Sequence, residues 1–140
     1  MTELLRYMLD TDTISFALRG VGEVAKHIHA HAPSELCLSA LSLAELRFGA
    51  EKRRSKRLHS LIDAFVGPLG VVPFDDSAAL EYGRLSALLK ERGTPIGAMD
   101  TLIAAHAVAL GVTLVTNNTK HFKRVRGLTS TNWLAAARER

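Results

Sequence analysis

Four short apolar runs recur along this chain, and segments with helical periodicity separate them. The runs lie at 7–10, 35–40, 70–74 and 112–117, and a weaker fifth run lies at 128–133. Helices are predicted between them at 11–20, 22–32, 41–54, 56–67, 75–93 and 95–111, with a short turn or helix at 120–125. Short strands that alternate with helices predict an α/β fold, in which a central parallel sheet of four to five strands has helices on both faces.

The size of the chain fits a single domain that covers residues 1–140. Its single cysteine, Cys37, cannot form an internal disulfide and lies in an apolar stretch, which predicts a buried side chain in a reducing compartment. No run approaches the roughly 18 uncharged apolar residues that a membrane helix needs. We therefore expect a cytoplasmic protein that does not bind membranes.

Polar side chains stand where several of these segments begin or end. Asp10 closes the first run, Glu45 lies in the first two turns of the helix after the second run, and Asp100 lies near the start of the helix before the fourth. Asn117 and Asn118 close the fourth run. Ligands of such sheets bind at the carboxyl ends of the strands, so we expect these side chains to converge there.

Each of these residues also has an ordinary structural interpretation. Asp10 can cap the first helix, and Asp100 can cap a helix that begins later than residue 95. Glu45 can be a half-exposed helix acid, and the two asparagines can form a turn. Capping explains each residue alone, but it explains their common placement less well.

Asp100 is the acid whose surroundings are most apolar. In a helix that starts at residue 95, Asp100 shares a face with Ile103, Ala104 and Ala107, and this face is predicted to contact the core. A lone carboxylate there would cost several kcal/mol unless a cation or hydrogen-bond donors met it. The position of Asp100 therefore predicts a partner for its charge.

A divalent metal ion is the partner that a cluster of carboxylates favours, because clustered acids stay ionised only beside a cation. Oxygen ligands without Cys or His are typical of Mg²⁺ or Mn²⁺ rather than zinc. Such ions activate water and offset the charge of a phosphodiester. The chain also has a net charge of +4, so a basic protein around an acidic metal site indicates a nuclease.

Four stretches of the chain resemble the PIN-domain nucleases, and more closely the VapC-type toxins of bacterial toxin–antitoxin pairs. The matching stretches are YMLDTDTISFALRG, LSALSLAELRFGAEK, IGAMDTLIAAHAVALGVTLVTNN, and HFKRVRGL followed by NW. The order of these stretches and the spacing between them agree with the family pattern along nearly the whole chain. The resemblance implies a Rossmann-like PIN domain and a Mg²⁺- or Mn²⁺-dependent endoribonuclease.

By position, the resemblance implies that Asp10, Glu45 and Asp100 are catalytic residues and metal ligands. Asn118 falls where many PIN domains have a fourth acid, which implies a catalytic contact with metal-bound water or phosphate. Asp12 stands where the family usually has Asn. It can add charge to the site or cap the first helix, and the cap is the preferred interpretation.

The resemblance also implies partners. They are a cognate antitoxin protein that blocks the site and an RNA substrate, with tRNA favoured because several relatives cut it. A homodimer is expected within a toxin–antitoxin complex that binds operator DNA through the antitoxin.

Two other functions stay open on the residues alone. A non-catalytic nucleic-acid-binding module would use the basic runs at 52–57 and 120–127 and leave the acids structural, although the first run is equally typical of a solvated helix end. A metal-dependent phosphatase would use Asp12, the second acid two residues after Asp10.

The histidines are predicted to have no metal or catalytic role. Of the three in HIHAHA, only His27 and His31 share a helix face, and no further zinc ligand is evident, so a solvated or interface helix is preferred. His106 and His121 are each predicted to be packed or solvent-facing.

Overall fold

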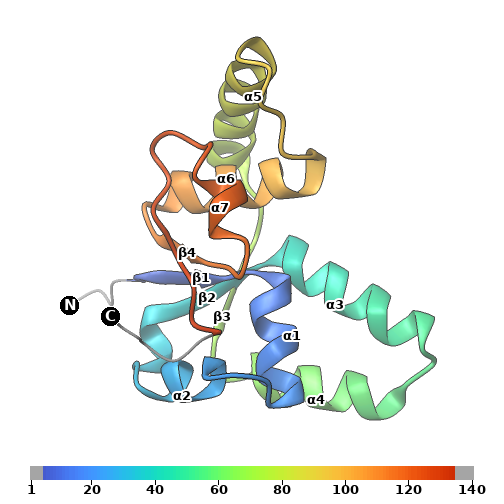
Figure 1. Cartoon of the computed structure of the whole chain (residues 1–140). Coiled ribbons are helices and arrows are strands. Elements are labelled where there is room, and N and C mark those ends of the chain that lie inside the picture. Colours follow the sequence, from blue (N-terminus) through green and yellow to red (C-terminus); the bar gives the residue numbers. More distant parts are fainter. Residues whose placement is uncertain (1–4, 135–140) are drawn as a thin grey trace.

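A parallel sheet of five strands forms the centre of the molecule (Figure 1). The computed structural model describes residues 5–134, so the ends of the predicted 1–140 domain lie outside the described residues. The strands are β1 (Tyr7–Leu9), β2 (Leu36–Ser39), β3 (Gly70–Val72), β4 (Thr113–Val115) and β5 (Ser130–Thr131). They lie in the order β3-β2-β1-β4-β5, and every neighbouring pair is parallel. The predicted sheet is confirmed, and the weak run at 128–133 contributes its edge strand.

Helices cover both faces of this sheet, as predicted (Figure 1). On one face lie α1 (Thr11–Arg19), α2 (Val24–His29), α3 (Ala40–Lys52) and α4 (Lys56–Val66). On the other lie α5 (Asp76–Glu91), α6 (Ala98–Leu110) and α7 (Thr119–Phe122). A short 3-10 turn, Pro33–Glu35, leads into β2. Among the helices of residues 5–134, none combines the length and apolar character needed to span a bilayer.

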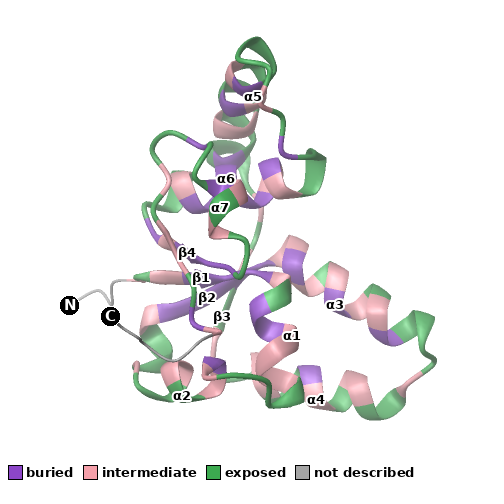
Figure 2. Ribbon diagram, in the orientation of Figure 1, coloured by how far each residue is buried: buried purple, intermediate pink, exposed green. Residues whose placement is uncertain are grey.

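Two hydrophobic cores flank the sheet because successive strand residues point to opposite faces. Met8 and Leu114 pack with α5, α6 and α7, whereas Leu9 and Val115 pack with α1, α3 and α4. The three central strands, β1, β2 and β4, are accordingly mostly buried, whereas the edge strands β3 and β5 are exposed or half-buried (Figure 2). Cys37 lies in the first core, as predicted, and burial raises the pKa of its thiol to about 11.

Two glycines set helix boundaries that matter for the site. Gly20 ends α1 with a φ of 68°, a left-handed conformation that glycine adopts without strain. Gly97 has a φ of 94°, so α6 begins at Ala98 rather than at residue 95 as predicted. The later start moves Asp100 into the first turn of the helix.

The predicted helix at 22–32 is shorter in the structure, and its histidines have an internal packing role. The rings of His27 and His31 stack on Trp133, with ring centroids 5.4 Å and 5.0 Å away. Tyr7 packs on the same indole at 5.0 Å. The preference for a solvated or interface helix is therefore wrong for His27 and His31, because the chain end returns across α2 and supplies Trp133.

Candidate active site

A small cavity at the carboxyl end of β1 gathers the predicted acids. Its volume is about 110 Å³, and its lining residues are Asp10, Thr11, Asp12, Glu45, Asp100 and Ile103. These residues come from the β1–α1 junction, from α3 and from α6. We call it the acid cavity. The structure thus brings together three residues that are 35 and 55 positions apart along the chain, Asp10, Glu45 and Asp100.

Asp10 is both the N-cap of α1 and a wall of the acid cavity. Its Oδ1 accepts a hydrogen bond of 2.9 Å from the backbone N–H of Thr13. Burial raises the pKa of Asp10 to about 6, hydrogen bonds from Thr116 and Thr13 oppose the rise, and the charge of Asp12 adds to it. The capping role foreseen for Asp10 is therefore confirmed, and the same carboxylate also lines the acid cavity.

Asp100 lies in the first turn of α6, where it faces the cavity rather than the core. Its side chain is 42% exposed, whereas Ile103, Ala104 and Ala107 behind it are buried. The expectation of a core-facing acid is wrong, because Asp100 lies in the first turn of α6, at the end of the helix that borders the acid cavity. The alternative of a cap is also wrong, since the N-cap is Gly97 and no side chain caps this end.

His121 is the immediate partner of Asp100. Its Nε2 lies 3.1 Å from Asp100 Oδ2 and 2.8 Å from the carbonyl oxygen of Ile96. Burial raises the pKa of Asp100 above its usual value, the His121 charge opposes this, and the Asp12 charge adds to it. Sequence reasoning missed this contact, and the only signal was the position of His121 just after β4, the strand beside β1.

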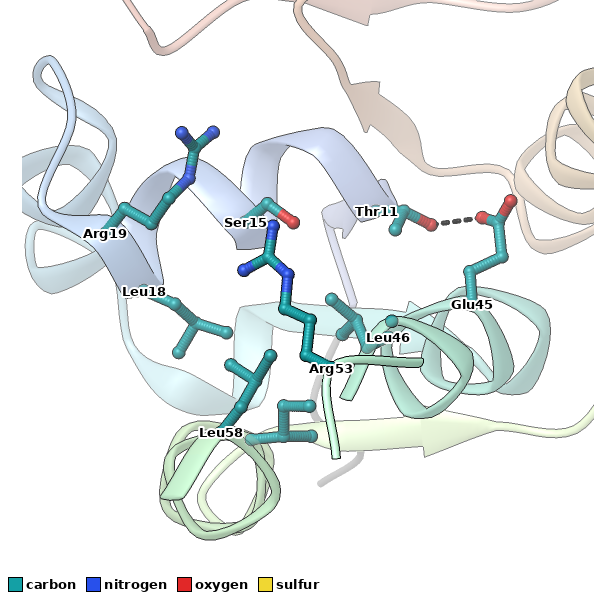
Figure 3. A pocket seen from close by; sticks show the side chains of 10 residues that line it. Thr11, Ser15, Leu18, Arg19, Glu45, Leu46, Arg53 and Leu58 are labelled. Carbon is teal, nitrogen blue, oxygen red and sulfur yellow. Dashed lines mark hydrogen bonds between the residues drawn. The ribbon is translucent and has the colours of Figure 1, made fainter. Parts of the chain in front are cut away.

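Glu45 lies on the half-buried flank of α3, between the buried and the exposed side of the helix. Ser42 and Leu46 lie on the buried side of this helix, whereas Phe48 is 68% exposed. The carboxylate of Glu45 accepts a hydrogen bond from the hydroxyl of Thr11 (Figure 3). Glu45 therefore reaches the acid cavity from the edge of the buried helix face.

A buried hydrogen bond fixes the start of α3. Ser39 ends β2, caps α3 by accepting from the N–H of Leu41 at 3.0 Å, and has its Oγ 2.9 Å from Nδ1 of His106. His106 is 1% exposed, so it takes the packed one of the two placements that were predicted for it. Burial lowers the pKa of His106, so it is held neutral beside Ser39.

Asp12 adds charge to the acid cavity and does not cap α1. The N-cap is Asp10, and Asp12 is an exposed residue in the first turn, where a negative charge favours the helix dipole. Its charge raises the pKa values of both Asp10 and Asp100. The preferred interpretation of Asp12 as a cap is therefore corrected.

Asn118 lies apart from the acid cavity as the side chains stand. It is exposed, occupies the N-cap position of α7 without a side-chain cap, and is not a lining residue. Its N–H donates to Thr116 Oγ1 at 3.1 Å, and the Thr116 side chain in turn hydrogen-bonds Asp10. Thr116, which sequence reasoning missed, links the end of β4 to the acids.

The donor set of the acid cavity fits an oxygen-preferring divalent ion. Carboxylates of Asp10, Asp12, Glu45 and Asp100 line one small space, and their repulsion is what a cation would relieve. Within residues 5–134, no three His, Cys, Asp or Glu side chains are oriented to hold a metal ion as they stand. Thr11 engages one oxygen of the Glu45 carboxylate and His121 one oxygen of the Asp100 carboxylate, so each has a second oxygen to offer an ion.

Comparison with known proteins places this site in a family. The model of the PIN domain matches residues 7–128, which is most of the chain. The chain belongs to the PIN domain family.

Curated relatives define the subgroup more narrowly. The chain is 35% identical over 131 residues to the tRNA(fMet)-specific endonuclease VapC of Salmonella typhimurium, which covers 93% of this chain and 99% of the relative. It is 35% identical over 133 residues to ribonuclease VapC2 of Haemophilus influenzae, with 94% and 100% covered. The predicted resemblance to VapC-type PIN domains is confirmed.

Solved structures agree with this placement. VapBC2 from Rickettsia felis, bound to a DNA fragment from its promoter, superposes with a TM-score of 0.86 at 34% identity, covering 92% of this chain and 99% of that one. DNA-bound VapBC from Salmonella typhimurium gives a TM-score of 0.87 at 34% identity, with 93% and 99% covered.

Proposed function

We propose that this protein is the metal-dependent endoribonuclease toxin of a toxin–antitoxin pair, and that it hydrolyses phosphodiesters of tRNA. The observation that carries the proposal is the acid cavity, in which acids from distant parts of a VapC-like chain meet at the carboxyl end of β1. Two of these acids have raised pKa values, which is typical of carboxylates grouped for function.

Asp10, Glu45 and Asp100 are the residues proposed to hold the ion, Mg²⁺ or Mn²⁺. When bound, such an ion lowers the pKa of water and offsets the charge of a phosphodiester. Asp10 is positioned for this by hydrogen bonds from Thr13 and Thr116, which fix its carboxylate at the strand end. Asn118 is proposed to contact the substrate phosphate or the water beside it from the start of α7.

The choice of tRNA rests on the relatives and on charge. One relative carries the name tRNA(fMet)-specific endonuclease. This chain has a net charge of +4, and the basic segment 120–127 directly follows β4 at the end of the sheet where the acids lie. Cations at that end are suited to hold the phosphates of a polyanionic substrate.

The proposed partners follow from the solved complexes. VapBC2 of Rickettsia felis and VapBC of Salmonella typhimurium are both described bound to DNA. We infer a cognate antitoxin that blocks the acid cavity, two copies of this chain in the complex, and operator DNA bound through the antitoxin. The proposed location is the cytoplasm, where tRNA is found.

Cleavage of tRNA tests the proposal. Purified protein free of antitoxin is expected to cut tRNA(fMet) in Mg²⁺ and to lose this activity in EDTA. Asp100→Asn is expected to lower the cleavage rate at least 100-fold, because one ligand charge is lost. The matched control is Asp76→Asn, which alters an exposed acid in the first turn of α5 and should retain full activity.

The contrary outcomes identify the alternatives. Tight tRNA binding without cleavage would indicate a non-catalytic module, and full activity in EDTA or in Asp100→Asn would reject the metal site. Covalent phosphorylation of Asp10 without RNA cleavage would indicate a phosphatase.

A further inference from the structure

A second, larger cavity adjoins the acid cavity between α1, α3 and α4. Its volume is about 310 Å³, within the size range of small-ligand sites. Thr11 and Glu45 line both cavities, so the two adjoin at this hydrogen-bonded pair, which Figure 3 shows from the side of the larger cavity. We call the second one the arginine cavity, because Arg19 and Arg53 line it.

The two arginines carry charge that no ion pair within residues 5–134 neutralises. Arg19 is in the last turn of α1 and Arg53 is the C-cap of α3, and neither belongs to an ion pair among residues 5–134. Arg47, on the same helix as Arg53, is by contrast paired with Asp63. The guanidinium of Arg19 rests on the ring of Phe16, 5.3 Å from its centroid.

The rest of the arginine cavity combines a hydroxyl with an apolar floor. In the view of Figure 3, Ser15 lies between Arg19 and Thr11, with the guanidinium of Arg53 just below it and that of Arg19 pointing the other way. Leu18 and Leu58 lie lower in this view, and Leu46 lies beside the Arg53 side chain. Guanidinium groups bind phosphate oxygens bidentately, and a serine hydroxyl can add a further hydrogen bond. The leucine side chains offer apolar surface to a sugar or base.

We propose that the arginine cavity is a nucleotide subsite, which holds the nucleotide of single-stranded RNA next to the bond that is cut. Arg19, Arg53 and Ser15 bind its phosphate, and the leucine floor contacts its ribose and base. The inference rests on the proposed ribonuclease function. Successive nucleotides of RNA are covalently linked, so a nucleotide bound at the acid cavity brings the next nucleotide of the same strand to the arginine cavity. Two unpaired cations beside a site for phosphodiesters favour RNA over a segment of protein.

Gly49 offers a way to fill the arginine cavity without removing charge. It lies within α3 and lines the cavity, and a Cβ added there meets no atom within 4 Å. Its helical backbone accepts a larger residue, so Gly49→Leu should raise helix propensity and leave the fold intact. Gly83→Leu is the matched control, because Gly83 lies within α5 and also has open space at its Cβ.

Binding is measured with a short fluorescein-labelled single-stranded RNA of mixed sequence, by anisotropy in EDTA and in the Asp100→Asn background, so that no cleavage intervenes. Arg53→Ala is expected to weaken binding about tenfold, because one charge-assisted contact is lost. Gly49→Leu is expected to weaken binding by about the same factor, because its side chain occupies the space of the nucleotide. Arg53→Ala should also reduce the slope of log affinity against log salt by about 0.7. The two controls, Gly83→Leu and Arg92→Ala, should change RNA affinity less than twofold. Arg92 is matched to Arg53 because it is the C-cap of α5, as Arg53 is the C-cap of α3.

The outcomes separate this inference from the proposed function. If the wild type cuts tRNA and Gly49→Leu binds and cuts RNA as the wild type does, the subsite is rejected while the ribonuclease stands. If Gly49→Leu loses affinity only for the antitoxin protein, the cavity is a protein-docking site and the inference is likewise overturned. If RNA binding depends on the cavity but the wild type cuts no RNA, the subsite stands and the ribonuclease is rejected.

Discussion

Asp10 has to satisfy two opposing requirements. As the N-cap of α1 its carboxylate accepts a hydrogen bond from a backbone N–H and is stabilised by the positive end of the helix dipole. As a residue only 8% exposed it loses the hydration that a carboxylate needs. The desolvation is the larger effect, because the pKa of Asp10 rises to about 6. In the metal-free protein its charge is therefore a source of instability near neutral pH.

Asp10→Asn tests this cost through its pH dependence. The pKa of Asp10 is higher in the folded protein than in the unfolded chain, so its contribution to stability is full below about pH 4 and is lost as the pH rises through 6. Asn keeps the cap but cannot ionise. The free energy of unfolding of the variant relative to wild type should rise by about 3 kcal/mol between pH 4 and pH 8. Urea denaturation in EDTA measures the free energy of unfolding of both proteins. A difference between variant and wild type that does not vary with pH would contradict the account.

Asp100→Asn should leave the metal-free protein as stable as wild type or more stable. Burial and the Asp12 charge both disfavour the ionised form of Asp100, and no cap is lost with it. Asp75→Ala is the contrasting variant, since Asp75 caps α5 by accepting from the N–H of Ala78, and its loss should cost about 1 kcal/mol. Thermal unfolding in EDTA compares the stability of both variants with that of the wild type. A marked destabilisation by Asp100→Asn would make Asp100 a structural residue.

The acids could be predicted as residues, but their partners could not. Asp10, Glu45 and Asp100 stood out because each has apolar neighbours beside a strand or helix end. Thr11, Thr116 and His121 did not stand out, because a threonine or histidine at a segment end is common. Their roles come from side-chain contacts between distant residues, such as Thr11 with Glu45, which no local periodicity encodes.

At the scale of elements, glycines and capping residues predicted the bounds of most helices, whereas two helices are shorter in the structure than predicted. The sequence pattern predicted α1, α4 and α5 nearly to their ends. The start of α6 shifted because Gly97 takes a positive φ. The helix α2 spans only Val24–His29, and the rings of His27 within it and His31 beyond it pack on Trp133, about a hundred residues later in the sequence.

The stack on Trp133 predicts that this side chain anchors α2 to the sheet. Trp133 is 6% exposed and contacts the rings of Tyr7, His27 and His31. Trp133→Ala should lower the free energy of unfolding by about 3–5 kcal/mol, and Trp133→Phe by less, because an aromatic ring is kept. Urea denaturation followed by circular dichroism measures both. A loss below about 1 kcal/mol for the alanine variant would show that the stack contributes little.

At the scale of the whole molecule, the strand order creates the site. The chain adds β2 and β3 on one side of β1 and then returns to place β4 on the other. The carboxyl end of β1 is thus flanked by connections that leave in opposite directions, where open α/β sheets bind ligands. Alternating strands and helices predicted a parallel sheet, but the return of β4 beside β1 depends on the packing of α5 and α6, which sequence patterns do not specify.

The central claim is that Asp10, Glu45 and Asp100 together hold a divalent metal ion, and calorimetric titration with Mn²⁺ tests it most directly. Metal-free wild type should bind the ion, and Asp10→Asn, Glu45→Gln and Asp100→Asn should each weaken binding at least tenfold. Asp76→Asn, an acid outside the cavity, should bind as wild type does. Mn²⁺ binding of wild-type affinity in Asp100→Asn would contradict the account.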